Sequence, residues 1–297
     1  MWSIGELAEH AGVTVKTVRF YSDRGLLPEA VRSAGGHRRY GPEALDRLRL
    51  IRALRTLDLP VPDVGRVLER QDALEDVVAG QLRELGSQLA ALRWREAALQ
   101  LLHDCAPGER AERLLLIGGM TTPPSTAPLA RFWRRWLPAR LPARVAASVI
   151  ELAVPQPPSD PTPAQVLAFA RLHAFTSAPC PGTDQPQPAV HRPDQGYRPA
   201  LIYEGLTEAY ALAAAPIRER RAPHEGEALD CFVSVYAHAR GTRDTPAFRR
   251  HLSGQLAADP RIDHYWQLTA EVTGSPEPTP GAAHDWLCTA LEAQTAP

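Results

Sequence analysis

The chain has 297 residues, of which 33 are Lys or Arg and 34 are Asp or Glu, so its net charge is −1. Its 44% hydrophobic content is typical of a globular protein and excludes a disordered chain. No apolar run approaches the roughly 20 residues that a membrane helix needs. Because Glu6 and Glu9 stand where a signal peptide would need an apolar segment, the sequence predicts a cytoplasmic protein with no membrane contact.

The near-zero net charge hides an asymmetry along the chain. Residues 1–57 contain ten Lys or Arg and six Asp or Glu, a balance of +4, whereas the remainder of the chain carries −5. A charge difference between regions is a reason to look for a nucleic-acid-binding module in the basic region.

The first 30 residues are predicted to form two short helices. Ser3 and Glu6 have the spacing of a capping box, and Gly12 ends the apolar pattern that follows them. Thr14 can cap a second helix, with Val15 and Val18 turned inward, and Gly25 stops it. Two short helices joined by a tight turn in a basic segment are typical of a helix-turn-helix.

A basic hairpin is predicted next, over residues 31–41. Gly35 and Gly36 suit a two-residue turn, and the second strand carries His37, Arg38, Arg39 and Tyr40. Beside a helix-turn-helix, such a hairpin is a wing whose cations can reach phosphates. Further helices are expected from Pro42 and after the Pro60–Pro62 segment, ending near Arg70.

A long helix is predicted from about residue 72 to His103, where no proline interrupts the chain. Its apolar residues recur in steps of four, three and seven, which is a coiled-coil pattern with Glu96 at the polar gap. The expected dimerisation residues are Val78, Leu82, Leu85, Leu89, Leu92 and Leu99. A helix of about 45 Å needs a partner surface, either a second copy of the chain, which we favour, or the chain's own C-terminal region.

The C-terminal region is rich in proline and aromatic residues, and short helices between proline-rich connectors are expected there. Apolar pockets lined by aromatic side chains suit organic ligands, although core packing is the alternative for each residue. The candidate ligand-binding residues are Trp133, Trp136, Tyr203, Tyr236, Tyr265 and Trp266. The sequence contains no nucleophile–base set, no glycine-rich phosphate loop and no paired-carboxylate motif, so we expect neither an enzyme nor a cofactor.

The four cysteines are too sparse for a disulfide scaffold. Cys105 follows His103 and Asp104 at the end of the long helix, but a metal site needs a second thiolate or imidazole that converges on the same point. Cys180 and Cys231 form no CxxC pair, which argues against a thiol redox sensor. No metal is therefore expected.

The N-terminal part of the chain resembles the MerR family of bacterial transcription regulators. The matching segments are Ile4–Ala8, Gly12–Thr14, Thr17–Tyr21, Gly25–Leu27 and Gly36–Tyr40, followed by the long helix, with Phe20 where the family usually has tyrosine. Residues 159–172, 258–274 and 285–293 resemble parts of a helical domain in actinobacterial regulators of this type.

The resemblance implies a mainly α protein with three parts. These are a winged helix-turn-helix over residues 1–70, an antiparallel dimerisation helix over 71–104, and an all-helical effector domain over 105–297. It implies a nucleoid-associated homodimer that binds double-stranded promoter DNA, responds to an effector and activates RNA polymerase by distorting an over-long promoter spacer. That this effector is a small organic molecule is predicted by the aromatic residues of the C-terminal region, not by the resemblance. The residues expected to contact DNA are Thr14, Val15, Lys16, Thr17, Arg19, Phe20, Tyr21, Arg32, His37, Arg38, Arg39 and Tyr40. For Tyr21 and Tyr40, packing in the core is the alternative.

Two other functions of the C-terminal region stay open. It could be an enzymatic domain fused to a DNA-binding head, in which case catalytic side chains should meet in one cleft. It could instead be a protein-interaction module, for which a flat apolar surface rather than a cavity is expected.

Overall fold

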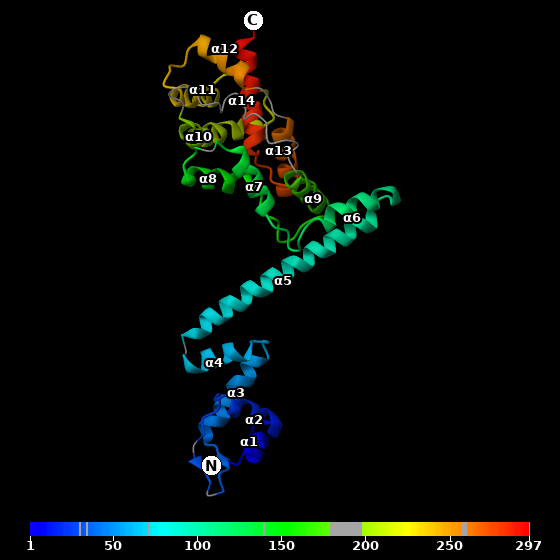
Figure 1. The fold of residues 1–297 in the computed structure, drawn as a ribbon, viewed down its shortest axis with the longest axis vertical. Helices are drawn as coiled ribbons and strands as arrows, with labels where there is room; N and C mark the ends of the chain where they lie inside the picture. The colour runs from blue at the N-terminus through cyan, green and yellow to red at the C-terminus, as the bar shows by residue number, and fades with distance from the viewer. Residues whose placement is uncertain are drawn as a thin grey trace. The chain divides into compact units, whose positions relative to one another are not determined.

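The computed structural model describes residues 1–29, 31–33, 35–70, 72–138, 140–178, 198–256 and 260–296. The fold is mainly helical (Figure 1), and no helix within these ranges is long and apolar enough to cross a membrane. The chain divides into two compact units, Met1–Leu89 and Ala90–Pro297.

The first unit is a winged helix-turn-helix followed by two further helices and the start of a long one. Its elements are α1 (Ile4–Ala11), α2 (Val15–Asp23), β1 (Val31–Arg32), β2 (Arg38–Arg39), α3 (Pro42–Arg55), α4 (Val61–Glu69) and the first half of α5 (Ala73–Asp104). Their apolar faces meet in one core, in which Leu7, Val18, Leu48, Ile51 and Val64 have no exposed surface.

The two short helices begin and end as the sequence predicts. The Ser3 side chain accepts from the Glu6 amide and the Glu6 carboxylate accepts from the Ser3 amide, so the capping box is complete. Thr14 accepts from the amide of Thr17 at the start of α2. Gly12 and Gly25 follow the two helices with φ of 62° and 72°, a backbone region that glycine adopts without strain.

The hairpin forms, but the predicted two-residue turn is wrong. Val31 pairs with Arg39 and Arg32 with Arg38, and the amide of Ser33 donates to the carbonyl of His37 over 2.9 Å. This register needs a longer connection than Gly35 and Gly36 alone, because the pairing continues inward to Ser33 and His37.

Helix α5 extends from the first unit into the second, and its bounds agree with the predicted helix. The second unit is all-helical within its described residues. After α5 come η1 (Pro107–Glu109), α6 (Arg110–Gly118), α7 (Ala127–Trp136), α8 (Ala143–Ala153), α9 (Pro163–Ser177), α10 (Pro199–Arg218), α11 (Glu227–Ala239), α12 (Pro246–Gln255), α13 (Pro260–Thr273) and α14 (Pro280–Thr295). The connector predicted over 179–199 lies almost wholly outside the described residues.

Three helices of the second unit share one start signal. Thr162, Thr245 and Thr279 each accept a hydrogen bond from an amide in the first turn of the helix that follows, and a proline occupies the next position. Proline is well suited to the first helical position because its missing N–H has no helical partner there. The prolines that divide the sequence therefore also begin its helices.

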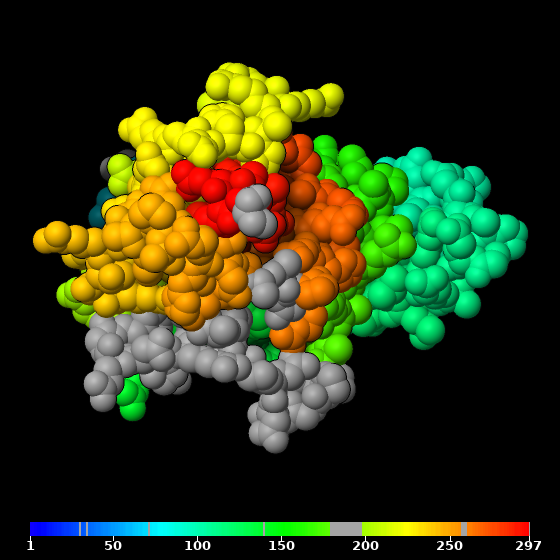
Figure 2. Space-filling view, turned by 90° about the horizontal axis from the view of Figure 1, so that it is seen from above, coloured from blue at the N-terminus to red at the C-terminus, as the bar shows by residue number. Residues whose placement is uncertain are grey.

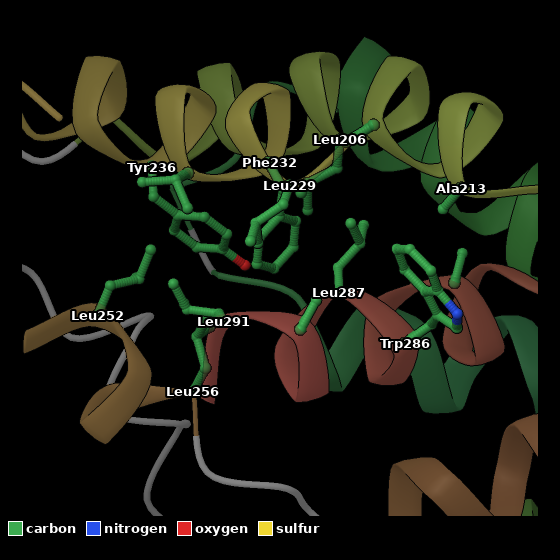
Figure 3. Packing of buried hydrophobic residues seen from close by; sticks show 14 of the residues in the cluster. Leu206, Ala213, Leu229, Phe232, Tyr236, Leu252, Leu256, Trp286, Leu287 and Leu291 are labelled. Carbon is green, nitrogen blue, oxygen red and sulfur yellow. The ribbon is translucent and has the colours of Figure 1, made fainter. Parts of the chain in front are cut away.

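The second unit has two large apolar cores. In one, Leu229, Phe232 and Tyr236 of α11 point towards Leu287 and Leu291 of α14, with α12 closing one end (Figure 3). Seen from above, α14 lies between α12 and α13 (Figure 2).

The other core joins α5, α7, α9 and α13. It includes Trp94, Trp133, Phe169, Tyr265 and Trp266.

Candidate functional site

The second helix of the helix-turn-helix presents an exposed face of mixed character. Lys16 and Arg19 are exposed, and Val15 and Phe20 keep 40% and 42% of their surface accessible. The guanidinium carbon of Arg24 lies 3.8 Å from the centre of the Phe20 ring, a cation–π arrangement. The prediction that Val15 turns inward is wrong: Val15 is exposed, and the buried side of α2 consists of Val18, Tyr21 and Ser22.

Tyr21 and Tyr40, each expected either to contact DNA or to pack in the core, are both buried. Tyr40 has no exposed surface, and its hydroxyl makes a 2.8 Å hydrogen bond with that of Ser22. The backbone of Tyr40 also pairs with Trp2 in a short antiparallel bridge. Of the two alternatives for Tyr40, the structure shows packing: its side chain joins the wing to α2 inside the core. Tyr21 is only 8% exposed and belongs to the same core.

The two arginines of β2 have different surroundings. Arg38 donates to Ser22 and forms ion pairs with Asp23 and Glu29, and the hydrogen bond to Asp23 raises the pKa of Arg38. Arg39 has one distant pair, 4.0 Å from Glu6, and its side chain is 41% exposed. Arg39 is therefore available to an outside partner, while Arg38 fixes the wing to the end of α2.

Arg32 and His37 complete the predicted set in the wing. Both are exposed, with Arg32 3.5 Å from Glu29.

Three arginines of α3 and its C-terminal end bond carbonyls of their own unit, a role that was not predicted. Arg47 donates to the carbonyl of Leu26 over 2.8 Å, Arg52 to that of Ala11, and Arg55 to that of Leu59. These contacts satisfy carbonyls at helix ends and in the following turns. The +4 balance of residues 1–57 thus overstates the charge that the surface offers.

Helix α5 is apolar on two opposite sides. Its leucine stripe, by which we mean Val78, Leu82, Leu85, Leu89, Leu92 and Leu99, is exposed at every position, from 36% at Val78 to 64% at Leu82. The opposite side is buried within the second unit, where Trp94, Ala97 and Leu101 are each at most 6% exposed. The helix therefore packs on its own C-terminal unit without using the leucine stripe.

The second unit contains a cavity of about 370 Å³ between α7, α8, α10, α11, α12, α13 and α14. Five of the six predicted ligand-binding residues line it, namely Trp133, Trp136, Tyr203, Tyr236 and Trp266. Tyr265 does not. Its ring lies in the core and its hydroxyl donates to the carbonyl of Ala153 over 2.8 Å.

Polar groups are set among the aromatic walls of this cavity. Asp263, Asp285 and Glu292 contribute carboxylates, and the Tyr210 hydroxyl lies 3.0 Å from Nδ1 of His284. Partial burial, together with the nearby charge of Asp263, raises the pKa of Asp285 to about 6. Burial also raises the pKa of the Cys288 thiol to about 12, so this thiol stays protonated and is a poor nucleophile.

No group of three or more metal-ligating side chains converges among the described residues. Cys105 is buried, and its thiol lies 3.3 Å from the carbonyl of Leu102. Cys180 lies outside the described residues.

The comparisons with known proteins agree with the geometry of the first unit. The family profile described as "MerR HTH family regulatory protein" matches residues 2–71. The chain is 40% identical over 89 residues to nodulation protein NolA of Bradyrhizobium elkanii, which is 30% of this chain and 41% of NolA. It is 33% identical over 119 residues to the transcriptional activator TipA of Streptomyces coelicolor, 37% of this chain and 47% of TipA.

A shorter relative is matched over most of its length. The chain is 33% identical over 116 residues to the transcriptional regulator ZntR of Escherichia coli, which is 36% of this chain and 82% of ZntR. By contrast, the chain spans less than half the length of NolA and of TipA. On the winged helix-turn-helix, the long helix and the match to ZntR, the chain belongs to the MerR family of transcriptional regulators.

Proposed function

We propose that this chain is a homodimeric, sequence-specific DNA-binding regulator whose C-terminal cavity receives a small organic effector. The observation that carries the proposal is that α5 has two apolar sides, of which only one is buried. One side is buried in the core of the C-terminal unit, while the leucine stripe on the other side is apolar and exposed. Water-exposed leucines at heptad spacing along one helix are the surface that a second such helix covers.

The DNA contacts are proposed for the exposed face of α2 and the wing. Lys16, Thr17 and Arg19 would enter the major groove, and Arg39 with Arg32 would reach flanking phosphates. Arg38 would act indirectly, by holding the wing against Asp23 at the end of α2. Binding to promoter DNA would place the protein at the nucleoid, in the cytoplasm.

Ligand binding in the cavity is proposed to affect α5 through the core that joins α5, α7, α9 and α13. Trp133 and Trp266 line the cavity, and their rings lie 5.5 Å apart. The same core includes Phe169 of α9, whose ring meets that of Trp94 on α5 at 5.6 Å. A ligand that displaces the cavity walls would therefore bias the position of α5, because packed cores shift between discrete arrangements.

The proposed consequence is activation by DNA distortion. Two heads fixed to α5 helices would bend and untwist a promoter whose spacer is too long for RNA polymerase, and the protein's binding to the bent DNA would offset the cost of bending. TipA, which shares the N-terminal part, is described as a transcriptional activator.

The proposal is tested by selecting a binding sequence from random duplexes and footprinting it with the full-length protein. We expect protection of a pseudo-palindromic site by two chains. Compounds that raise the melting temperature should change the footprint or transcription from that promoter in vitro. Stabilising compounds that change neither would contradict the sensing half of the proposal, and failure to select any sequence would contradict the DNA-binding half.

A further inference from the structure

We infer that the cavity of the C-terminal unit binds an aromatic organic cation, a protonated amine in which the charge is attached to a flat apolar body. This ligand class rests on the proposed role of the cavity as the effector site. The inference rests on the position of three carboxylates, Asp263, Asp285 and Glu292, beside aromatic side chains of α7, α10, α11 and α13 in the same cavity.

The described Asp, Glu, Lys and Arg residues that line the cavity are all acidic. Three carboxylates line it, and none of the lining residues that the structure describes is Lys or Arg. Among the described residues, no ion pair or hydrogen bond engages the Asp285 carboxylate. A ligand that brings a positive charge would gain from these groups, whereas an anion would be repelled.

The aromatic walls suit the same class of ligand. The rings of Trp133, Trp136, Trp266, Tyr203 and Tyr236 line the cavity. Their faces carry the negative part of the ring quadrupole, which attracts organic cations, and their area removes the apolar body from water. A volume of about 370 Å³ lies within the range of small-molecule sites.

Two buried polar atoms of lining residues have no hydrogen-bond partner among the described residues. Nε1 of Trp133 and Oε1 of Gln255 form no hydrogen bond within the described residues, and Trp133 is only 5% exposed. Buried polar atoms of this kind are costly unless a ligand or water satisfies them. The Gln255 oxygen requires a donor such as an ammonium N–H, and the Trp133 indole requires an acceptor.

The ionisation of Asp285 agrees with an incoming cation. Its carboxylate is partly desolvated and faces the like charge of Asp263, and both effects raise the pKa of Asp285 to about 6. A positive charge placed between the two would relieve this repulsion. Cation binding should therefore release a proton from Asp285 near pH 6.

Three ligands with one aromatic body test the inference by calorimetry on the full-length protein without DNA. They are 1-naphthylmethylammonium, the neutral 1-naphthylmethanol and the anion 1-naphthoate. We expect the ammonium to bind at least about tenfold more tightly than the alcohol, as one favourable charge contact predicts. We expect the anion to bind most weakly.

The double variant Asp263→Asn/Asp285→Asn should remove the preference for the ammonium and leave the affinity for the alcohol unchanged. The matched control is Glu225→Gln/Glu271→Gln, which makes the same change in net charge at exposed positions outside this cavity. It should keep the preference, and circular dichroism should report a native fold for both variants. If the double variant does not fold, Asp285→Asn alone should still reduce the preference.

Equal or tighter binding of the alcohol or the anion would overturn the inference, as would a preference that survives in the folded double variant. Absence of binding by all three ligands would overturn it too. If the ammonium binds with the expected preference but leaves the footprint on DNA unchanged, the proposed regulation fails while the inferred ligand class stands.

Discussion

Single arginines of the first unit have opposite roles that their positions in the sequence do not reveal. Arg38 and Arg39 are neighbours on β2, yet Arg38 is paired with Asp23 and Glu29, whereas Arg39 has only a 4.0 Å pair with Glu6 among the described residues and a side chain that is 41% exposed. Arg47, Arg52 and Arg55 bond backbone carbonyls. A count of basic residues therefore predicts the presence of a DNA-binding unit better than it predicts which side chains touch DNA.

Replacing Arg38 or Arg39 by alanine separates these roles. Arg39→Ala should leave the melting temperature unchanged and reduce the slope of log affinity against log salt by about one, the value for one phosphate contact. Arg38→Ala should lower the melting temperature, because it removes the ion pairs to Asp23 and Glu29 and the hydrogen bond to Ser22. Calorimetry and fluorescence anisotropy with a selected duplex measure both effects, and the reverse assignment would contradict the structure.

The raised pKa of Asp285 predicts a pH dependence of stability. Its folded-state pKa, about 6, exceeds its ordinary value of 3.8, so between these values the folded chain binds the proton more tightly. Its contribution to stability is therefore lost as pH rises from about 4 to about 6. Asp285→Asn should raise the melting temperature at pH 8, and the gain should vanish near pH 4.

The groups that line the same cavity near Asp285 are Asp263, His284, Cys288 and Glu292. Asp263→Asn should lower the pKa of Asp285, since it removes the like charge. If Asp285→Asn melts below the wild type at pH 8, the carboxylate of Asp285 does not destabilise the fold as its raised pKa predicts.

At the scale of elements, the sequence predicted where helices begin and end more reliably than it predicted the wing turn or the burial of single side chains. Both N-caps of the helix-turn-helix and the bounds of α5 follow from local signals. The turn of the wing could not be predicted because the register of β1 and β2 is set by tertiary contacts of Tyr40 with Trp2 and Ser22. Val15 was misplaced because the buried side of α2 consists of Val18, Tyr21 and Ser22, which leaves Val15 exposed at the first position of the helix.

The leucine stripe of α5 predicts a loss of dimerisation in Leu85→Lys/Leu89→Lys. Each buried leucine is worth about 1.5–3 kcal/mol, so the dimer dissociation constant should rise more than about a hundredfold. Light scattering after size exclusion measures the mass. Ser87→Lys is the control, because it lies about 200° around the helix from Leu85. A double variant that remains dimeric would contradict the assignment of the stripe.

The approach of α13 to α14 predicts that Gly281→Ala destabilises the C-terminal unit. A Cβ at this position would overlap the indole of Trp266, which lines the cavity. Overpacking of this kind typically costs about 1–3 kcal/mol in urea denaturation. Gly254→Ala on α12 meets no atom within 4 Å and should be neutral or slightly stabilising. Equal effects of the two substitutions would contradict the close packing.

At the scale of the whole molecule, the sequence predicted the order of the parts and the aromatic character of the cavity, but not its composition. Trp133, Trp136 and Trp266 were singled out by type alone. Asp263, Asp285 and Glu292 were not, because seven helices converge on the cavity and no local pattern reports that convergence. The match to the family and to NolA likewise covers only the N-terminal part of the chain, so the C-terminal unit is interpreted from its own residues.

The most direct test of the account is energy transfer between dyes at the two ends of a selected operator duplex, bound by the full-length protein. The ligand is a compound that raises the melting temperature of the wild type but not of Asp263→Asn/Asp285→Asn. We expect two chains per duplex and a change in transfer when the compound binds the wild-type complex, with no change in the double variant. A compound that binds the cavity and leaves transfer unchanged in the wild-type complex would contradict it.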